Sequence, residues 1–426
     1  MFRKPALTAR TLVALAVGIV ALLASSAAAG SAPARSSSPG SEGAVDTYVV
    51  VLKGSVGSPA ATAERHADQV GADVVAVYSQ AIKAYTAELS AADVAVLRAD
   101  SSVLHVERDQ ILHTMQTGPA VPTGVRRINA HTNPNIDIDG VDDARINVDV
   151  AVIDTGVAAH SDLNVVARVN CSSGSCVSGG TDANGHGTHV AGTVAAIDNS
   201  TGVVGVAPGA RIHSVRVCNA FGQCSLSAII AGVNYVTARA STIEVVNVSL
   251  GGPGSSSALN TAITNSVNAG VVYAVAAGNS NQNTSGFFPA SHPDVISVSA
   301  LSDSDGLAGG TGGAPTCRSG ERDDYKATFS NYGTTVEVAA PGVCIRSTWN
   351  NGGYNTISGT SMASPHVAGA AALLASAHRD PTNRTQALAI RTRIMQTGNS
   401  GWTDTSGDGE LEPLINVGNA SSYPGP

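Results

Sequence analysis

The sequence predicts an α/β protein with a mostly parallel central sheet and helices on both faces, preceded by a small α+β domain. Two observations predict the large domain. After Arg145, short apolar runs alternate with segments of helical periodicity, as in sheets that are covered on both sides. The polar residues that could carry chemistry follow those runs or begin those helical segments, which is where parallel sheets place their sites.

The small domain is predicted by an earlier alternation of strands and helices in the order βαββαβ. This order is typical of ferredoxin-like α+β domains. The predicted elements are Thr47–Leu52, Ala60–Val70, Val74–Ser79, Ala84–Leu89, Ala91–Ala99 and Val103–Glu107.

The large domain is predicted to begin with the buried strand Val148–Ile153. A helix then starts near His186, and a long apolar helix follows Ser361. The Gly-rich segment Ser302–Ser319 predicts an inserted surface loop that is held by Cys317. The other predicted strands and helices are Arg211–Val217, Leu226–Thr237, Ile243–Val248, Ser257–Ala269, Val271–Ala276 and Met362–Ala377.

The N-terminus has the layout of a secretory signal peptide. Basic residues precede the apolar run Thr11–Leu23, and the small residues Ala27-Ala28-Ala29 offer a cleavage site. We therefore predict a signal peptide at 1–29, a flexible linker at 30–46 and an extracellular location. A membrane anchor is the alternative, but the apolar run is shorter than the ~20 residues that a spanning helix needs.

Length and charge exclude some classes of protein. A chain of 426 residues can bury a large core and still carry a further domain. Its net charge of −8, without a basic stripe, argues against binding to nucleic acid. Because no second apolar span occurs, we expect no membrane contact after removal of the signal peptide.

The six cysteines of an exported chain suggest disulfides, and the sequence alone leaves many pairings open. The pairs that close spacing favours are Cys171 with Cys176, Cys218 with Cys224, and Cys317 with Cys344. Free buried thiols are the alternative. No cysteine belongs to a Cys/His pattern of a zinc site, so we exclude zinc.

Asp154, His186 and Ser361 are the candidate catalytic residues. Asp154 directly follows Val148–Ile153, the first predicted strand of the large domain. His186 lies in the motif Asn184-Gly185-His186-Gly187-Thr188-His189. Ser361 lies in the motif Gly359-Thr360-Ser361-Met362-Ala363-Ser364-Pro365-His366. A serine hydroxyl needs a base to become a nucleophile, and a carboxylate can hold that base. Taken singly, each residue has an ordinary structural role, so the hypothesis of catalysis depends on their joint occurrence in this order.

The chain order Asp, His, Ser within these motifs resembles that of the subtilisin-like serine proteases, or subtilases, and among them the proteinase K group. The resemblance implies that Ser361 attacks the peptide bond, His186 carries the proton and Asp154 orients His186. It implies that Asn279, in Ala276-Ala277-Gly278-Asn279, and the Ser361 backbone N–H hold the oxyanion. The implied substrate-binding residues are Ser249, Leu250, Gly251 and Gly278.

Three further histidines receive structural interpretations. His189 follows His186 by three residues and is expected to pack or hydrogen-bond beneath the site. His366 lies inside the helix that follows Ser361 and is expected to be structural. His160, soon after Asp154, is expected in a surface loop.

The small domain is similar to the propeptide inhibitor domain that precedes many secreted subtilases. The resemblance implies a propeptide at 47–116, a catalytic domain at 117–426 and self-cleavage near Met115–Gly118. The tail His113-Thr114-Met115-Gln116 would then lie in the cleft like a product. A permanent accessory domain is the alternative.

Calcium is also implied by the resemblance, as a structural ion held by two carbonyls and a carboxylate, at Pro293, Val295 and Glu337, although relatives usually have Asp at the last position. No catalytic cofactor is expected. The segment Asp404–Gly409 begins like a calcium loop, but Ile415 stands where an EF-hand has Glu. A polar turn is the preferred interpretation there.

The function that we expect is that of a secreted, autoprocessed serine endopeptidase that hydrolyses extracellular proteins through an acyl-enzyme, with broad specificity. Its expected partners are protein and peptide substrates and its own propeptide, and we expect a monomer. Two alternatives stay open. A narrow processing protease would share the catalytic residues, and a non-enzymatic secreted binding protein would use the same fold.

Overall fold

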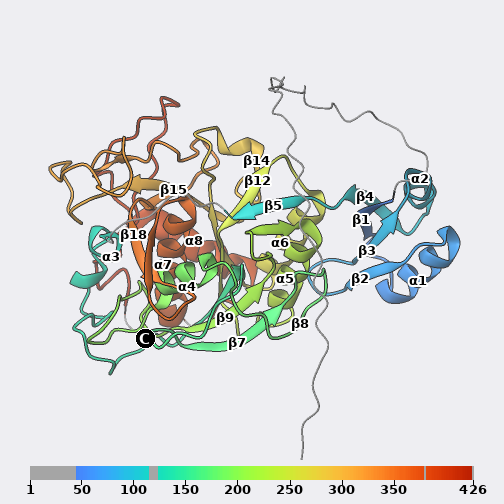
Figure 1. The fold of residues 1–426 in the computed structure, drawn as a ribbon, viewed down its shortest axis with the longest axis horizontal. Helices are drawn as coiled ribbons and strands as arrows, with labels where there is room; N and C mark the ends of the chain where they lie inside the picture. The colour runs from blue at the N-terminus through green and yellow to red at the C-terminus, as the bar shows by residue number, and fades with distance from the viewer. Residues whose placement is uncertain (1–44, 115–122, 379, 425–426) are drawn as a thin grey trace, which may run out of the picture. The chain divides into compact units, whose positions relative to one another are not determined.

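The computed structural model describes residues 45–114, 123–378 and 380–424 (Figure 1). The predicted signal peptide, nearly all of the predicted linker and the predicted cleavage segment Met115–Gly118 lie outside these residues.

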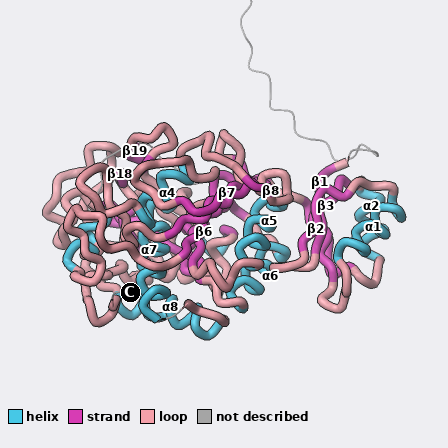
Figure 2. Tube along the Cα trace, turned by 90° about the horizontal axis from the view of Figure 1, so that it is seen from below, coloured by secondary structure: helices cyan, strands magenta, loops and turns pink. Residues whose placement is uncertain are grey.

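The N-terminal domain, residues 46–108, is a four-stranded antiparallel sheet in the order β2-β3-β1-β4. Figures 1 and 2 show its two helices together on one face of the sheet. Ser58 caps the first helix, and Ser90 and Asp93 form a capping box on the second. The elements are β1 (Asp46–Leu52), α1 (Pro59–Val70), β2 (Val74–Tyr78), β3 (Ala84–Leu89), α2 (Ala91–Ala99) and β4 (Val103–Arg108). The predicted βαββαβ order is confirmed.

The strand β5 (Ile111–Thr114) leaves the N-terminal domain and joins strands of the rest of the chain. It pairs on one side with β10 (Gln223–Ser225) and on the other with β12 (Leu250–Pro253), which also pairs with β14 (Phe287–Phe288). A segment that precedes the large domain in sequence is therefore built into one of its sheets.

The large domain, residues 123–424, is organised around a nine-stranded sheet in the order β16-β15-β13-β11-β6-β9-β7-β8, with β17 beside β15. The pairs that involve β6, β9, β11, β13 and β17 are parallel, and only short end strands pair antiparallel. The predicted mostly parallel sheet is confirmed. Its strands are β6 (Asp149–Asp154), β7 (Val165–Asn170), β8 (Val177–Ser178), β9 (Arg211–Arg216), β11 (Val245–Val248), β13 (Val272–Ala276), β15 (Ile296–Ser302), β16 (Tyr325–Lys326) and β17 (Val338–Pro341).

Helices cover both faces of this sheet. Helix α4 packs against α7, helix α5 packs against α6, and the two pairs lie on opposite sides of the central strands in Figures 1 and 2. Nearly all of the buried apolar side chains of these layers form one continuous cluster. The helices are α3 (Gly124–Arg127), α4 (His186–Ala195), α5 (Leu226–Thr237), α6 (Ser257–Asn268), α7 (Thr360–His378) and α8 (Arg384–Thr397), and a hairpin of β18 (Ile345–Thr348) and β19 (Tyr354–Ile357) precedes α7.

Disulfides close three loops of the large domain. The bonded pairs are Cys171 with Cys176, Cys218 with Cys224, and Cys317 with Cys344. The favoured pairing is therefore confirmed. Residues 303–319 contain no helix or strand, and the disulfide of Cys317 joins this loop to the segment before β18, as predicted.

Candidate active site

Asp154 and His186 meet because a strand ends where a helix begins. Asp154 is the last residue of the fully buried strand β6, and His186 is the first residue of α4. The Asp154 Oδ1 atom lies 2.8 Å from His186 Nδ1, and it also accepts a hydrogen bond from the Thr155 N–H at 2.7 Å. Both side chains are buried, so the pair can hold the imidazole with Nδ1 protonated and directed at the carboxylate.

A second buried carboxylate, Asp182, fixes the turn that presents His186. Its Oδ1 accepts hydrogen bonds from the Thr155 hydroxyl at 2.9 Å and from the Gly185 N–H at 2.8 Å. Its Oδ2 accepts from the Thr188 N–H at 3.0 Å and from the Thr188 hydroxyl at 2.7 Å. Asp182 thus caps α4 and ties the neighbour of Asp154 to the neighbours of His186. The sequence interpretation missed this residue, although an Asp just before a predicted helix is a signal for capping.

Ser361 lies in the first turn of α7, which begins at Thr360. The Ser361 hydroxyl donates to the Ser249 carbonyl at 3.2 Å, and the Ser249 hydroxyl donates to the Ser361 carbonyl at 2.9 Å. The Asn247 amide donates to the Ser249 hydroxyl and accepts from the Ser364 hydroxyl, both at 2.8 Å. These contacts fix the start of α7 beside β12. The unpaired N–H groups at a helix start favour negative charge near the serine.

Asn279 follows β13 and is anchored by the residue before Ser361. Its Oδ1 accepts hydrogen bonds from the Thr360 N–H at 2.9 Å and from the Thr360 hydroxyl at 3.0 Å. Its Nδ2 is buried and has no hydrogen-bond acceptor among the described residues. A buried donor without an acceptor is costly, and an oxyanion that develops during a reaction would satisfy it.

Gly278 adopts a conformation that suits glycine alone. Its φ is +111°, and a Cβ on this residue would lie 2.3 Å from Asn331 Nδ2. The Gly278 N–H donates to the Thr360 hydroxyl at 3.1 Å. A side chain at this position would therefore displace the segment that carries Asn279.

The strand β5 lies between two edge strands of the large domain. Its residue Thr114 is in register with Leu250 of β12, and His113 is in register with Gly251 of β12 and Gln223 of β10. Two of the predicted substrate-binding residues, Leu250 and Gly251, thus belong to a strand whose edge holds an extended segment of this chain. Pairing of this kind gains main-chain hydrogen bonds without requiring particular side chains.

The sequence matches two families of known proteins. It matches the Subtilase family over residues 145–414 and the Peptidase inhibitor I9 family over residues 47–115. The chain belongs to the subtilase family. It is a serine endopeptidase of the subtilisin type, preceded by an inhibitor domain that corresponds to the N-terminal domain.

Named relatives support this assignment. This subtilase is 43% identical to Subtilisin DY from Bacillus licheniformis over 256 residues, which cover 59% of this chain and 83% of the relative. It is 38% identical to Subtilisin NAT from Bacillus subtilis subsp. natto over 327 residues, which cover 75% of this chain and 77% of the relative.

Two solved structures resemble the subtilase. Fervidolysin from Fervidobacterium pennivorans, described as a keratinolytic enzyme related to subtilisin, superimposes with a TM-score of 0.68 at 25% identity and covers 90% of this chain and 61% of its own. A cold-adapted subtilisin-like serine proteinase superimposes with a TM-score of 0.54 at 31% identity and covers 70% of this chain and 98% of its own.

The other histidines near the site are structural, with one correction. His189 Nε2 lies 2.9 Å from the Ile345 carbonyl and His366 Nδ1 lies 2.8 Å from the Met362 carbonyl. Burial lowers the pKa of His189 to about 3 and that of His366 to about 4, so both rings are neutral. The surface position expected for His160 is wrong.

His160 is only 8% exposed. Its Nε2 lies 2.9 Å from the Gly353 carbonyl, and its Nδ1 accepts a hydrogen bond from the Asp162 N–H at 3.1 Å. Its ring also packs edge-on against Tyr354. The hairpin of β18 and β19 covers this histidine, and that contact between distant segments cannot be recognised from local sequence.

The residues expected to bind calcium instead face an arginine. The Arg391 guanidinium donates to the Val295 carbonyl at 3.1 Å and to the Glu337 carboxylate at 2.6 Å. The second Glu337 oxygen accepts from the Ser297 N–H at 2.6 Å. Two of the three expected ligands, Val295 and Glu337, therefore already contact a positive charge, so the arrangement with Pro293 does not fit a calcium ion. Calcium at this position stays a prediction, and the contacts of Arg391 do not support it.

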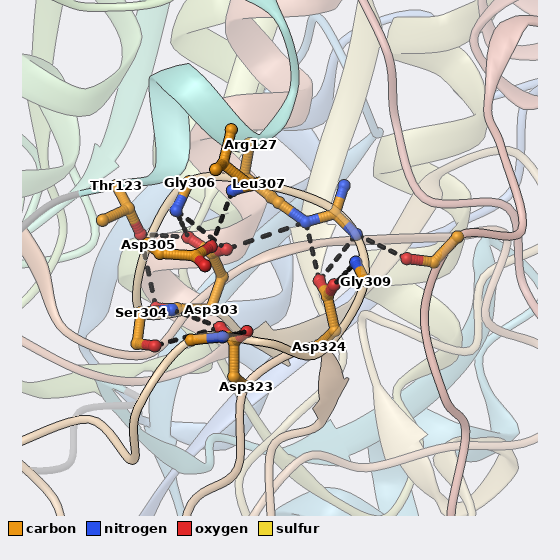
Figure 3. Close-up of polar contacts among 12 residues, drawn as sticks. Thr123, Arg127, Asp303, Ser304, Asp305, Gly306, Leu307, Gly309, Asp323 and Asp324 are labelled. Atoms are coloured by element: carbon orange, nitrogen blue, oxygen red, sulfur yellow. Dashed lines mark hydrogen bonds and ion pairs between the residues drawn. The ribbon is translucent and has the colours of Figure 1, made fainter.

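A cluster of carboxylates from the Gly-rich loop and the segment after it could hold a metal. One oxygen from each of Asp303, Asp305 and Asp323 lies within 4.8 Å of the others, and Figure 3 shows these side chains together, with Arg127 between Asp303 and Asp324. Burial raises the pKa of Asp303 to about 6. Oxygen ligands of this kind suit calcium, and members of this family commonly bind structural calcium. The sequence interpretation assigned no function to this loop.

The segment Asp404–Gly409 is a polar turn, as preferred. The Ser406 hydroxyl donates to Asp404 at 2.5 Å and to Asp408 at 2.8 Å.

Among the described residues, no helix is long and apolar enough to cross a bilayer.

Proposed function

We propose that this subtilase is a secreted, autoprocessed endopeptidase of broad specificity that is made as an inhibited precursor. The observation that carries the proposal is the position of β5 between β10 and β12. The strand ends at Thr114, immediately before the segment predicted to be cut. The chain thereby supplies its own first substrate and, after cleavage, its own inhibitor.

The proposed reaction follows from the geometry of the four predicted catalytic residues. The Ser361 oxygen attacks the peptide carbonyl and its proton passes to His186 Nε2, while Asp154 stabilises the imidazolium through Nδ1. The oxyanion accepts hydrogen bonds from Asn279 Nδ2 and from the Ser361 N–H. His186 then protonates the leaving amine, and a water molecule repeats the attack on the acyl-enzyme.

Two carboxylates of the N-terminal segment support the inhibitory role, because they cap helices of the large domain. Glu107 accepts hydrogen bonds from the Ser256 hydroxyl and the Ala258 N–H, both at 3.0 Å, at the start of α6. Asp109 accepts from the Ser227 N–H at 2.8 Å and from its hydroxyl at 2.5 Å, at the start of α5. Negative charge at a helix N-terminus is stabilising, so docking satisfies groups on both partners.

A third contact joins the N-terminal domain to the large domain. The Asn234 side chain of α5 accepts hydrogen bonds from the backbone N–H groups of Gln80 at 2.6 Å and Ala81 at 2.7 Å. The Tyr78 hydroxyl also donates to the Ser227 carbonyl at 3.2 Å. These contacts hold the N-terminal domain in place independently of β5.

Broad specificity and secretion rest on separate observations. Substrate held like β5 would bind through its backbone between β10 and β12, which places few demands on side chains. The layout of residues 1–29 supports secretion. The proposed enzyme acts as a monomer.

The test compares the full precursor with Ser361→Ala and with a control, Ser376→Ala. The control changes a serine on the same helix whose hydroxyl has no hydrogen-bond partner within the described part of the chain. Chain mass and casein hydrolysis are followed with and without a serine-directed covalent inhibitor. The parent and the control should shorten and digest casein, while Ser361→Ala should stay full length and inactive. A folded parent that neither shortens nor cleaves casein would contradict the proposal.

A further inference from the structure

Residues 277–282 form the turn that follows β13 and carries Asn279. The turn contains no helix or strand. Two of its residues, Gly278 and Asn281, have positive φ angles of +111° and +50°, a conformation that few residues adopt without support from their surroundings. Backbone groups that such a turn directs into the protein need hydrogen-bond partners from other segments.

Asn331 supplies several of these partners from a segment that is distant in sequence. Its Oδ1 accepts hydrogen bonds from the Ser280 N–H and the Gln282 N–H, both at 3.0 Å. Its Nδ2 donates to the Ala277 carbonyl at 2.9 Å, and its backbone N–H donates to the Gly278 carbonyl at 2.9 Å. Asn331 is fully buried. A single residue thus pairs with the turn on both sides of its predicted oxyanion donor.

The carboxamide of Asn331 fits these contacts by its chemistry and by its shape. Its oxygen has two lone pairs and can accept from both N–H groups, while its NH2 group donates to a carbonyl. An ionised aspartate could accept the same two bonds but could not donate to Ala277. The side chain also fills the space that Gly278 leaves open, because a Cβ on Gly278 would lie 2.3 Å from Asn331 Nδ2. The glycine and the asparagine therefore complement each other.

Asn279 is held from two directions as a result. Thr360 donates two hydrogen bonds to its Oδ1, and Asn331 pairs with the residues before and after it. Its Nδ2 is left as a buried donor without an acceptor among the described residues. A donor of this kind accelerates a reaction when it is already held at the place where negative charge develops. A displacement of about 1 Å can cost about 100-fold in rate.

We propose that Asn331 is a positioning residue for the reaction: it holds turn 277–282 so that Asn279 Nδ2 is directed at the oxyanion. Asn331 acts through Asn279 and is not itself a catalytic residue. The inference rests on the proposed role of Asn279 as an oxyanion donor. An asparagine with a purely structural role would stabilise the fold without any dependence on Asn279.

The experiment is a double-mutant cycle in which Asn331→Ala and Asn279→Ala are made singly and together in the full precursor. Tagged parent enzyme matures each precursor and is removed by its tag, and titration with a serine-directed covalent inhibitor counts the competent sites. In the parent background, Asn331→Ala should lower kcat by about 10- to 100-fold and change KM by less than about 3-fold. In the Asn279→Ala background, it should lower kcat by less than about 2-fold, because no side-chain donor remains there to be positioned.

A conservative variant covers the case in which Asn331→Ala does not fold. Asn331→Asp keeps the size of the side chain and its two accepting contacts and removes the donor to Ala277. Its kcat should also fall, and again only while Asn279 is present.

The matched control is Asn133→Ala, which truncates another buried asparagine. The Asn133 amide donates to the Val417 carbonyl at 2.8 Å and to the Tyr423 carbonyl at 3.2 Å, and its oxygen accepts from the Asn135 N–H at 3.0 Å. This variant should lose several degrees of thermal midpoint, as Asn331→Ala should, because both lose buried hydrogen bonds. Its kcat should be unchanged.

The outcomes separate the inference from the proposal on which it rests. An equal fall of kcat in both backgrounds, or an unchanged kcat in the parent background, would overturn the positioning role of Asn331 and leave the role of Asn279 intact. If Asn279→Ala alone leaves kcat unchanged, the proposed oxyanion donor is wrong and the inference fails with it.

Discussion

The N-terminal domain and the large domain differ in how much of their stability comes from contacts within the domain itself. The large domain has three disulfides and one continuous apolar cluster around its sheet. The N-terminal domain has no cysteine and a core that is confined to ten buried side chains between its sheet and its two helices. A domain of about 60 residues is only marginally stable by itself. The comparison teaches that the inhibitor is built to depend on the enzyme to which it is docked.

The largest expected effect is a loss of catalytic activity in the large domain. It does not change the difference in stability between the two domains. Asn279→Ala should lower kcat by about 100- to 1,000-fold, the magnitude known for an oxyanion donor in subtilisin itself. The thermal midpoint should fall by only a few degrees, because the variant loses the two hydrogen bonds that Asn279 Oδ1 accepts from Thr360, whereas Nδ2 has no partner to lose among the described residues. Steady-state kinetics with a chromogenic peptide and a thermal scan of the same sample test both statements. A loss of stability that accounts for the loss of activity would contradict the assignment.

The next prediction concerns a double variant that weakens the contact between the N-terminal domain and the large domain. Glu107→Ala with Asp109→Ala removes the caps of α5 and α6 that the N-terminal segment supplies. Each lost cap costs about 0.5–2 kcal/mol, so the lag before casein hydrolysis should shorten by about 10-fold. Glu88→Ala, an exposed carboxylate of β3, is the control and should keep the lag. An unchanged lag in the double variant would show that the caps do not contribute to inhibition.

The third prediction concerns a charge pair that stabilises the large domain alone. Burial raises the pKa of Glu337 to about 7, and Arg391 is its partner at 2.6 Å. At pH 8, Arg391→Ala leaves a buried carboxylate unpaired, which costs about 3–5 kcal/mol. The thermal midpoint of a Ser361→Ala background should fall by roughly 10 °C.

A second substitution and a cation sharpen the test. Glu337→Gln added to Arg391→Ala should recover part of the stability, because no buried charge then remains. Millimolar calcium should raise the midpoint of Arg391→Ala more than that of its parent, because Val295 and Glu337 then face no guanidinium. Equal shifts in the two proteins would show that the guanidinium does not stand in for a metal.

The smallest expected effect is a difference between the two domains in how their stability depends on pH. Burial raises the pKa of both Glu244 and Glu412 to about 7. Their contribution to the stability of the large domain is therefore complete below about pH 4.5, the range of the unfolded carboxyl, and is lost as the pH rises through 7. In the N-terminal domain, the hydrogen bond from Arg65 lowers the pKa of Asp100. That contribution is present above about pH 4 and is lost as the pH falls.

Hydrogen exchange of the Ser361→Ala precursor between pH 3.5 and 8.5, resolved by segment, measures the two responses together. The large domain should lose protection at the alkaline end, and Glu244→Gln should reduce that loss. The N-terminal domain should lose protection at the acid end. A common response in both domains would contradict the assignment of these groups.

The sequence was sufficient for features that depend on local pattern or short separation. The βαββαβ domain and the mostly parallel sheet follow from periodicity, and the structure has them. Close spacing favoured the three disulfides among the pairings that the sequence left open, and the structure has these as well. The error at His160 arose because its cover comes from a hairpin 193 residues away. The contact of Glu337 with Arg391 could not be predicted, because Arg391 is 54 residues away on a helix whose orientation the sequence does not specify. Asp182 had a local signal as a helix cap and was overlooked.

The position of β5 has a consequence for timing. A strand that belongs to the chain is present in the cleft at an effective concentration that dilution does not change. The first cut would therefore proceed at the same rate in dilute and concentrated precursor. Removal of the freed inhibitor by other enzyme molecules would instead accelerate with concentration. The precursor molecules would remain inactive at first and then become active almost together. The delay before activity would therefore depend on how many precursor molecules had accumulated.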